Sequence, residues 1–327
     1  MKTVLKELFK GKRLSFQESK DALLEVGKGN INNSLISSFL TVFMMRNIEG
    51  EELEGFRAAM LELCNPVNLG EIKTIDMCGT GGDGKNTFNV STTSSFVVAA
   101  SGIKVAKHGN YGVSSGVGSS NVIEHLGYHF KGDEKTLKSE IQNSGITFFH
   151  APLFHPAMRF VGPVRKELGL KTFFNMIGPL VNPSKPNYQL TGVYDPSILP
   201  LYNHVLSNNL ERYAILHSED VYDEISLTSD FYIYSHNGVE KLSPSDLRLS
   251  KLKPEEIGGG DSVDYAARVL TNVLSGKGTK AQQEVVAANA GVAISVAKDV
   301  KLHEGVEEAL DIINEGKAID VLHRLIK

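Results

Sequence analysis

Tryptophan is absent from the 327 residues of this chain, and cysteine occurs only twice, at Cys64 and Cys78. Two cysteines cannot build a disulfide framework, which argues against a disulfide-rich secreted domain. Cys78 stands immediately before a glycine-rich stretch, but no histidine lies near it in the sequence. We therefore interpret Cys78 as an inert buried thiol rather than a nucleophile.

The chain also lacks an excess of basic residues and lacks long apolar runs. Lysine and arginine total 34 against 38 aspartates and glutamates, so the net charge of −4 gives no sign of a nucleic-acid partner. The apolar runs are far shorter than the roughly 20 residues that a membrane-spanning helix needs. The first residues, Met1 to Val4, show no signal-peptide core. We expect a cytoplasmic enzyme without a membrane partner.

The N-terminal part, up to about residue 70, shows only helical patterns. The composition, 41% hydrophobic and 22% charged, provides for a sizeable core and suggests two lobes. Ser15 and Glu18 form a capping box ahead of an apolar helical face. A broad apolar stripe then runs from Leu35 to Met44. Packing within a helical lobe and a subunit interface explain this stripe equally well.

From residue 72 the pattern changes to alternating strands and helices, which is typical of layered α/β folds. The predicted strands are residues 72–77, 103–106, 146–149, 190–193, 213–216 and 231–234. The last of these is followed by His236, Asn237 and Gly238, a sequence that predicts a hairpin. Residues 263–327 are again predicted to be helical.

The most informative stretch contains Gly79, Gly81, Gly82 and Gly84, four glycines in six positions. Such a loop can adopt positive φ angles and bring backbone N–H groups close to an anion. A helix beginning near Ser91 adds further free N–H groups and the positive end of its dipole. The simplest ligand for this loop is a phosphate or a pyrophosphate.

Two familiar phosphate-binding patterns are matched here only in part. Gly79, Gly81 and Gly84 satisfy the dinucleotide-binding spacing, but residues 85–90 separate them from the helix, and Lys107 directly follows the next predicted strand where an acid is expected. The stretch from Gly79 to Lys85 nearly matches a P-loop, but Asn86 replaces the hydroxyl residue that binds Mg²⁺. We reject both interpretations.

Several motifs in order resemble the anthranilate phosphoribosyltransferase family, and the resemblance covers essentially the whole chain. The motifs are residues 76–92, 107–110 with 113–115 and 118–119, 155–159 with 162–169, 174–183, and the acidic pair Asp223 and Glu224. None of them is specific alone, whereas their order and spacing together are.

The resemblance implies an α/β fold with two domains. A small all-helical domain would comprise residues 1–70, with a returning segment near 166–184. A larger α/β domain, residues 71–165 and 185–327, would hold a central mixed, mainly parallel sheet flanked by helices. Pro163, Pro179, Pro183 and Pro186 flank and break the returning segment in a way that suits hinges.

The implied reaction transfers the phosphoribosyl group of 5-phosphoribosyl 1-pyrophosphate to the amine of anthranilate, a step of tryptophan biosynthesis. Pyrophosphate leaves through an oxocarbenium-like transition state, so positioning and electrostatics carry the catalysis, and no residue is predicted to react covalently. The resemblance assigns to phosphoribosyl pyrophosphate Gly79, Gly82, Asp83, Thr87, Asn89, Val90, Ser91, Thr92, Lys107, His108, Gly109, Asn110, Tyr111, Gly112, Val113, Ser114, Ser115 and Ser119. Lys107 is expected to follow a strand and to offer its ammonium to a phosphate. Asp83 suits ribose hydroxyls or a metal.

For anthranilate, the resemblance implies contacts from Gly79, Asn110 and Arg165. The planar guanidinium of Arg165 matches a carboxylate in bidentate fashion. His108, His155 and Pro179 are candidates to line the aromatic channel, although for His155 a structural role is the favoured interpretation.

Magnesium is the implied cofactor, with Ser91, Asp223 and Glu224 as its ligands. Mg²⁺ is a hard cation that shares a few carboxylates with substrate phosphates. Glu219 and Asp220 are further candidates. The resemblance also implies a homodimer formed through the N-terminal helices.

Tyr111 and Gly112 depart from the family, which usually has an arginine followed by a small residue there.

Two other functions stay open. A pyrimidine nucleoside phosphorylase has a similar glycine loop but needs an additional C-terminal domain. A basic surface and the loss of the acidic pair would favour a non-catalytic relative that binds nucleic acid, whereas the net charge of −4 and the presence of Asp223 and Glu224 point away from it.

Overall fold

The computed structural model describes residues 1–112 and 117–327. Its centre is a seven-stranded sheet in the order β3-β2-β1-β4-β5-β6-β7. The first five strands in that order run parallel to one another. Strand β6 pairs antiparallel with β5, and β7 pairs antiparallel with β6. The strands are β1 (Thr74–Met77), β2 (Lys104–Gly109), β3 (Ile146–His150), β4 (Tyr188–Gly192), β5 (Arg212–Ser218), β6 (Phe231–Ser235) and β7 (Gly238–Leu242). The predicted mixed, mainly parallel sheet is confirmed.

All six predicted strands are present, with ends that differ by a few residues. The largest consequence is in β2, which continues to Gly109 instead of ending at Ala106. Its pairing with β3 extends to Gly109 and His150, so hydrogen bonding between strands carries it past the apolar run. The predicted hairpin is formed by β6 and β7, whose last pair is Ser235 and Gly238.

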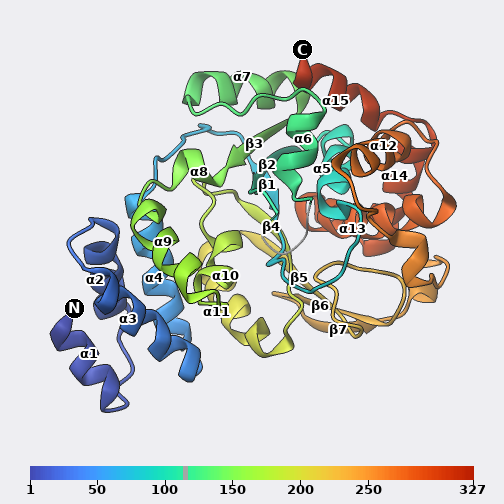
Figure 1. Cartoon of the computed structure of the whole chain (residues 1–327). Helices are drawn as coiled ribbons and strands as arrows, with labels where there is room; N and C mark the ends of the chain where they lie inside the picture. The colour runs from blue at the N-terminus through green and yellow to red at the C-terminus, as the bar shows by residue number, and fades with distance from the viewer. Residues whose placement is uncertain (113–116) are drawn as a thin grey trace.

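Helices cover the sheet and continue the chain to its C-terminus (Figure 1). Around the sheet lie α5 (Val90–Ala100), α6 (Ser119–His125), α7 (Glu134–Ser144), α8 (Ala151–Phe154), η3 (Pro244–Leu247), η4 (Pro254–Ile257), α12 (Val263–Leu274), α13 (Lys280–Lys298), α14 (Leu302–Asn314) and α15 (Ala318–Ile326). Helix α13 is alanine-rich and almost fully buried, which lets it pack closely against α5, α14 and the sheet. The predicted helical C-terminal part is confirmed.

A second apolar core lies among the N-terminal helices, drawn in blue in Figure 1. These are α1 (Lys2–Phe9), α2 (Phe16–Gly27), α3 (Asn33–Met45) and α4 (Gly50–Leu63). Ser15 and Glu18 form the predicted capping box at the start of α2. The stripe on α3 is used inside this core, because Ile36, Phe39 and Phe43 are buried there.

The chain returns to this N-terminal core after residue 157. The returning part contains α9 (Met158–Leu168), α10 (Phe174–Ile177) and η1 (Gly178–Leu180), followed later by η2 (Pro196–Ile198) and α11 (Leu199–Asn209). The ring of Phe173 stacks on Phe56 with 4.5 Å between centroids and meets Phe39 edge-on at 6.3 Å. Aromatic burial of this kind anchors the returning segment among the N-terminal helices.

The prediction that Pro163 breaks the returning segment is wrong, because Pro163 lies inside α9. The side chain of Pro163 is exposed, whereas those of Val161 and Val164 are buried in the N-terminal core. Packing of this apolar face therefore holds the helix together across the proline, despite the backbone hydrogen bond that proline cannot donate.

Candidate active site

The candidate site lies at the point in the sheet where the strand order reverses. After β1, the chain adds β2 and β3 on one side, and then crosses to add β4 and β5 on the other. Ligands in open α/β sheets bind outside the carboxyl ends of the strands at such a switch point. The glycine-rich loop follows β1, residues 110–112 follow β2, and Asp223 and Glu224 follow β5, so all three segments meet at this edge.

The glycine-rich loop and the acidic pair are held together by a direct hydrogen bond. The backbone N–H of Gly81 donates to Oδ2 of Asp223 over 2.7 Å. The loop can approach so closely because Gly79 and Gly192 have no side chains. A Cβ on Gly79 would lie 2.5 Å from Oδ2 of Asp223, and a Cβ on Gly192 would lie 1.5 Å from the carbonyl oxygen of Asp223. The two glycines therefore set the position of the acidic loop.

The second acid, Glu224, contacts the first turn of α5. The backbone N–H of Ser91 donates to Oε1 of Glu224 over 2.9 Å. The helix N-terminus stabilises this negative charge through its dipole and its free N–H groups. The structure thus brings Ser91 and Glu224 into contact and places Asp223 in the adjacent position, although residues 91 and 223 are far apart in the sequence.

The electrostatics of this acidic group favour a bound cation. Burial and repulsion from Asp83 raise the pKa of Asp223, and burial and repulsion from Asp223 raise the pKa of Glu224. Burial also raises the pKa of Asp83. A divalent cation would neutralise these crowded carboxylates, so the residues fit Mg²⁺. Across residues 1–112 and 117–327, no three His, Cys, Asp or Glu side chains are arranged to hold a metal alone. The oxygens of a phosphate substrate would have to complete the shell.

The rest of the glycine-rich loop and the start of α5 surround this group. Oδ1 of Asp83 accepts from the N–H of Lys85 over 3.0 Å, and the amide of Asn89 donates to the carbonyl of Val117 over 3.3 Å. Thr87 pairs with Gly258 through an isolated bridge. The hydroxyl oxygens of Thr80 and Thr92 are buried and have no partner among the described residues. Val90 is buried in the core and offers no side chain to a ligand.

Lys107 lies within β2 rather than after it, which corrects its predicted place in the fold. Its side chain is buried, and its ammonium donates to the carbonyl of Met77. Burial lowers the pKa of Lys107, while the nearby charges of Asp76 and Glu224 favour the protonated form. The ammonium therefore lies beneath the start of the glycine-rich loop.

Two buried histidines form a neutral, partly polar wall beside η1. The rings of His108 and His155 are 5.4 Å apart, and Nδ1 of His108 lies 3.2 Å from the carbonyl oxygen of Gly178. Burial lowers the pKa of His108 to about 3 and that of His155 to about 4, so both are uncharged at neutral pH. Nε2 of His108 has no partner in the part of the chain that the structure describes.

Arg165, on α9, carries a charge that no acid compensates within residues 1–112 and 117–327. One terminal nitrogen donates to Oδ1 of Asn175 over 3.2 Å, and the guanidinium lies 5.4 Å from the ring centroid of Phe174. Its Nε is buried without a described partner. The same Asn175 oxygen accepts from the N–H of Thr172 over 2.9 Å, which fixes the asparagine. The arrangement leaves Arg165 able to bind an anion.

The segment after β2 is organised by Asn110 and Tyr111. Oδ1 of Asn110 accepts from the N–H of Tyr111 over 2.8 Å, and its backbone carbonyl accepts from the hydroxyl of Ser119 over 3.3 Å. The Tyr111 ring meets His150 edge-on at 4.6 Å between centroids. Gly109 leaves room for the Ser119 hydroxyl, which would lie 2.7 Å from an added Cβ. Gly112 donates to Oδ1 of Asn121 over 3.1 Å. Val113, Ser114 and Ser115 lie outside the described residues.

Sequence reasoning missed Lys171. Its ammonium donates to the carbonyl of Gly82 over 2.8 Å and to the hydroxyl of Tyr194 over 2.9 Å. Lys171 belongs to the returning segment, so it connects that segment to the glycine-rich loop. No local pattern marks an exposed lysine as such a contact. Cys78 is half-buried, not fully buried as predicted. Desolvation raises the pKa of its thiol to about 12, which fits the interpretation that it is inert.

Comparisons with known proteins give consistent results over both parts of the chain. Residues 71–319 match the α/β domain of a glycosyl transferase family, and residues 2–64 match the helical bundle domain of that family. The chain is 52% identical to the anthranilate phosphoribosyltransferase of Christiangramia forsetii, over 100% of this chain and 99% of the relative. It is 42% identical to the enzyme of that name from Bacteroides thetaiotaomicron, over 100% and 99% of the two chains.

Solved structures agree. The crystal structure of anthranilate phosphoribosyltransferase from Thermus thermophilus superposes with a TM-score of 0.93 at 31% identity, covering 98% of each chain. The Saccharomyces cerevisiae enzyme in complex with phosphoribosyl pyrophosphate and Mg has a TM-score of 0.90 at 27% identity, covering 98% of this chain and 95% of the yeast chain.

Proposed function

This chain belongs to the anthranilate phosphoribosyltransferase family, and from that premise we propose that it transfers the phosphoribosyl group of phosphoribosyl pyrophosphate to the amine of anthranilate. The products are N-(5-phosphoribosyl)anthranilate and pyrophosphate, in a step of tryptophan biosynthesis. One observation carries the proposal. A glycine-rich loop, a helix N-terminus and two half-buried acids meet at the carboxyl edge of the sheet, held by the contacts from Gly81 to Asp223 and from Ser91 to Glu224.

The residues divide between the two ends of the reaction. The bond from C1 to the pyrophosphate oxygen breaks as the bond from C1 to the anthranilate nitrogen forms. The glycine-rich loop and the first turn of α5 would hold the phosphates, and Lys107 beneath the loop would add positive potential. Mg²⁺, held by Ser91, Asp223 and Glu224, would neutralise charge on the leaving pyrophosphate.

Anthranilate would enter on the side of α9 and η1. Arg165 would bind its carboxylate through the guanidinium, which has no acidic partner among the described residues. The neutral rings of His108 and His155 would lie beside the aromatic ring, and Asn110 would contact the amine. Because both histidines are uncharged, they add no positive charge that would destabilise the cation developing at C1.

The test of this function follows anthranilate fluorescence over time. The signal should fall only when phosphoribosyl pyrophosphate and Mg²⁺ are both present. Omitting each in turn is the control. Phosphorolysis of uridine or thymidine without any turnover of anthranilate would contradict the proposal and favour a nucleoside phosphorylase.

We further propose that residues 1–70 with 166–184 form one domain and that the remainder forms the other, with closure between them on substrate binding. Burial of Phe173 against Phe56 supports this division. The bond from Lys171 to Gly82 is then a contact between the two domains. Helix α11 also contributes Tyr202 and Leu206 to the N-terminal core, so it would lie at the boundary. We propose a cytoplasmic location; no helix in the described parts of the chain is both long and apolar enough to cross a membrane.

A homodimer through the N-terminal helices is also proposed. The inner face of the α3 stripe is buried within one chain, so the contact would use the outer side chains instead. Met45 is 84% exposed and Phe9 is 67% exposed, and both lie on these helices. Light scattering is expected to give twice the chain mass of 35.6 kDa. Met45→Glu with Phe9→Glu should shift the mass toward the monomer, whereas a monomer for the unaltered protein at all concentrations would show that the proposal is wrong.

The variant Arg165→Ala should impair the use of anthranilate much more than that of phosphoribosyl pyrophosphate. A charge-assisted hydrogen bond contributes about 1.5–3 kcal/mol, which corresponds to roughly a 10- to 150-fold rise in the KM for anthranilate. Steady-state kinetics with each substrate varied in turn measures both constants. Lys166→Ala, which changes an exposed neighbour on α9, is the control. Equal losses for the two substrates would show that Arg165 does not bind the anthranilate carboxylate.

A further inference from the structure

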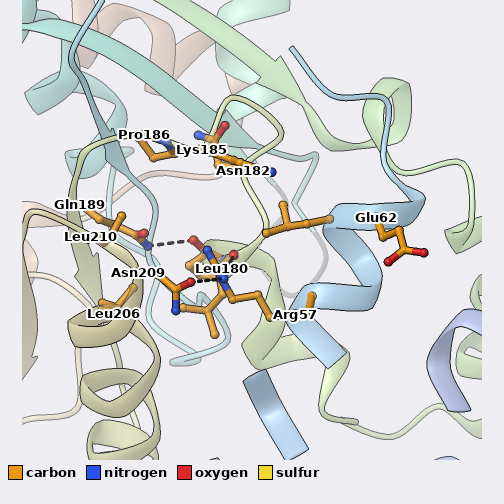
Figure 2. Close-up of a pocket in the computed structure, with 13 residues that line it drawn as sticks. Arg57, Glu62, Leu180, Asn182, Lys185, Pro186, Gln189, Leu206, Asn209 and Leu210 are labelled. Atoms are coloured by element: carbon orange, nitrogen blue, oxygen red, sulfur yellow. Dashed lines mark hydrogen bonds between the residues drawn. The ribbon is translucent and has the colours of Figure 1, made fainter. Parts of the chain in front are cut away.

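A cavity of about 500 Å³ lies between α4, η1 and α11, and its lining is shown in Figure 2. Part of its wall is apolar, formed by Leu61, Leu206 and Leu210, and two cationic residues, Arg57 and Lys185, lie on it. Among the described residues assigned to either substrate, Pro179 alone also lines this cavity. The cavity is therefore separate from the acidic group and from Arg165.

Arg57 carries a partly buried charge that only neutral groups contact. Its Nε donates to the carbonyl of Leu180 over 2.9 Å, and Nη1 donates to Oδ1 of Asn209 over 2.7 Å (Figure 2). Burial lowers the pKa of Arg57. Glu54, the acid whose charge acts on it, is bonded instead by Asn209 over 3.2 Å and lies 3.3 Å from His204. Within residues 1–112 and 117–327, no ion pair compensates Arg57, so an anion in the cavity would remove an electrostatic cost.

The second cation, Lys185, stands at the rim in a conformation that the surrounding turn enforces. Its φ angle is 49°, a left-handed value that a lysine adopts only at a cost. The N–H of Lys185 donates to the carbonyl of Asn182 over 3.1 Å, and the Asn182 amide donates to Oδ2 of Asp76 over 2.9 Å. The acid on the wall, Glu62, is paired with Lys20 over 2.7 Å. The local field therefore favours a negative ligand.

The cavity is connected to the candidate active site through the η1 turn. Its three consecutive carbonyls each have a different partner: that of Gly178 lies 3.2 Å from Nδ1 of His108, that of Pro179 accepts from Gln189 over 2.8 Å, and that of Leu180 accepts from Arg57 over 2.9 Å. Gln189 and Arg57 line the cavity, whereas His108 lies on the substrate side. Arg57 and His108 therefore contact the same turn from opposite sides.

We propose that this cavity binds a small carboxylate with an apolar body and that its occupancy changes the affinity for anthranilate through η1. The carboxylate would accept hydrogen bonds from the planar guanidinium of Arg57 and the ammonium of Lys185, and the apolar body would pack on Leu206 and Leu210. The binding part stands on the geometry alone. The effect on anthranilate rests on the proposed function.

The binding test uses calorimetric titration of the full chain with hexanoate, and with hexanamide as a neutral probe of the same shape. Hexanoate is expected to bind more tightly than hexanamide. Arg57→Gln should weaken hexanoate roughly 10- to 100-fold, and Lys185→Gln, which leaves the contacts of Arg57 in place, should weaken it by a smaller factor. Lys277→Gln, at an exposed lysine between α12 and α13, should leave binding unchanged.

Arg165→Ala separates this cavity from the anthranilate channel, and hexanoate is expected to bind this variant as it binds the unaltered protein. Equal affinities for hexanoate and hexanamide, binding that persists unchanged in both Arg57→Gln and Lys185→Gln, or binding that disappears in Arg165→Ala would each overturn the proposal.

A kinetic measurement tests the connection through η1. Hexanoate should change the KM for anthranilate and leave the KM for phosphoribosyl pyrophosphate unaltered, and Lys185→Gln should shift this change to higher hexanoate concentrations. Calorimetric binding without any kinetic effect would show that the connection is wrong. A protein that binds hexanoate as expected but never consumes anthranilate would instead show that the proposed function is wrong.

Discussion

The double variant Asp223→Asn with Glu224→Gln is expected to lose activity by at least ~100-fold while keeping its fold. The amides retain the size of the side chains, and their oxygens can still accept from the N–H groups of Gly81 and Ser91. What they lose is two negative charges, which the proposed Mg²⁺ needs. The pyrophosphate would then leave with its developing charge poorly neutralised, and metal assistance of this kind contributes several kcal/mol.

Steady-state turnover across a Mg²⁺ titration measures this effect. Excess Mg²⁺ should recover part of the activity, because free Mg²⁺ still loads the substrate. Glu219→Gln is the matched control, since Glu219 lies in the same segment but is exposed and pairs with Lys241 over 2.7 Å. Turnover close to that of the unaltered protein at every Mg²⁺ concentration would mean that the acidic pair does not hold the metal.

The metal-free stability of the double variant provides a second check. The pKa values of Asp223 and Glu224 are raised in the folded protein, so the folded state holds protons that the unfolded state releases. The free energy of unfolding of the unaltered protein should therefore fall as pH rises above about 4 and through the raised folded-state values. The amide variant lacks this contribution, so thermal unfolding should show it to be relatively more stable at pH 8 than at pH 4.

Gly192→Ala is expected to reduce activity by roughly 100-fold, because displacing a catalytic group by about 1 Å has an effect of this size. An added Cβ would lie 1.5 Å from the carbonyl oxygen of Asp223 and 2.4 Å from its carbonyl carbon. No side-chain rotation can relieve a contact with backbone atoms. Either the end of β4 or the acidic loop must move, and the acidic loop carries both proposed metal ligands.

The control is Gly162→Ala on α9, where an added Cβ has nothing within 4 Å. This variant should keep its activity and its stability. Kinetics with circular dichroism distinguishes the expected local displacement from global unfolding of Gly192→Ala. Full activity of Gly192→Ala would show that the position of the acidic loop matters less than the structure indicates.

Local sequence patterns were sufficient for most of the fold. Alternating apolar runs predicted six strands of the sheet, and Ser15 with Glu18 predicted the start of α2, because strand periodicity and helix capping depend on residues close together in the chain. The two clear errors, the early end of β2 and the break at Pro163, occur where partners distant in sequence override a local preference. Pairing with β3 extends β2, and burial of Val161 and Val164 carries α9 through the proline.

The site shows the same division. The density of glycines after residue 78 and the adjacent acids Asp223 and Glu224 indicated by themselves a phosphate loop and a candidate cation ligand, because residue type determines which chemistry is possible. Only the tertiary structure determined that Gly192 allows Asp223 to approach, that Lys107 points beneath the loop, and that Lys171 reaches Gly82. Such contacts join residues 30 or more positions apart, and their geometry follows from the packing of whole helices and strands, which no local pattern encodes.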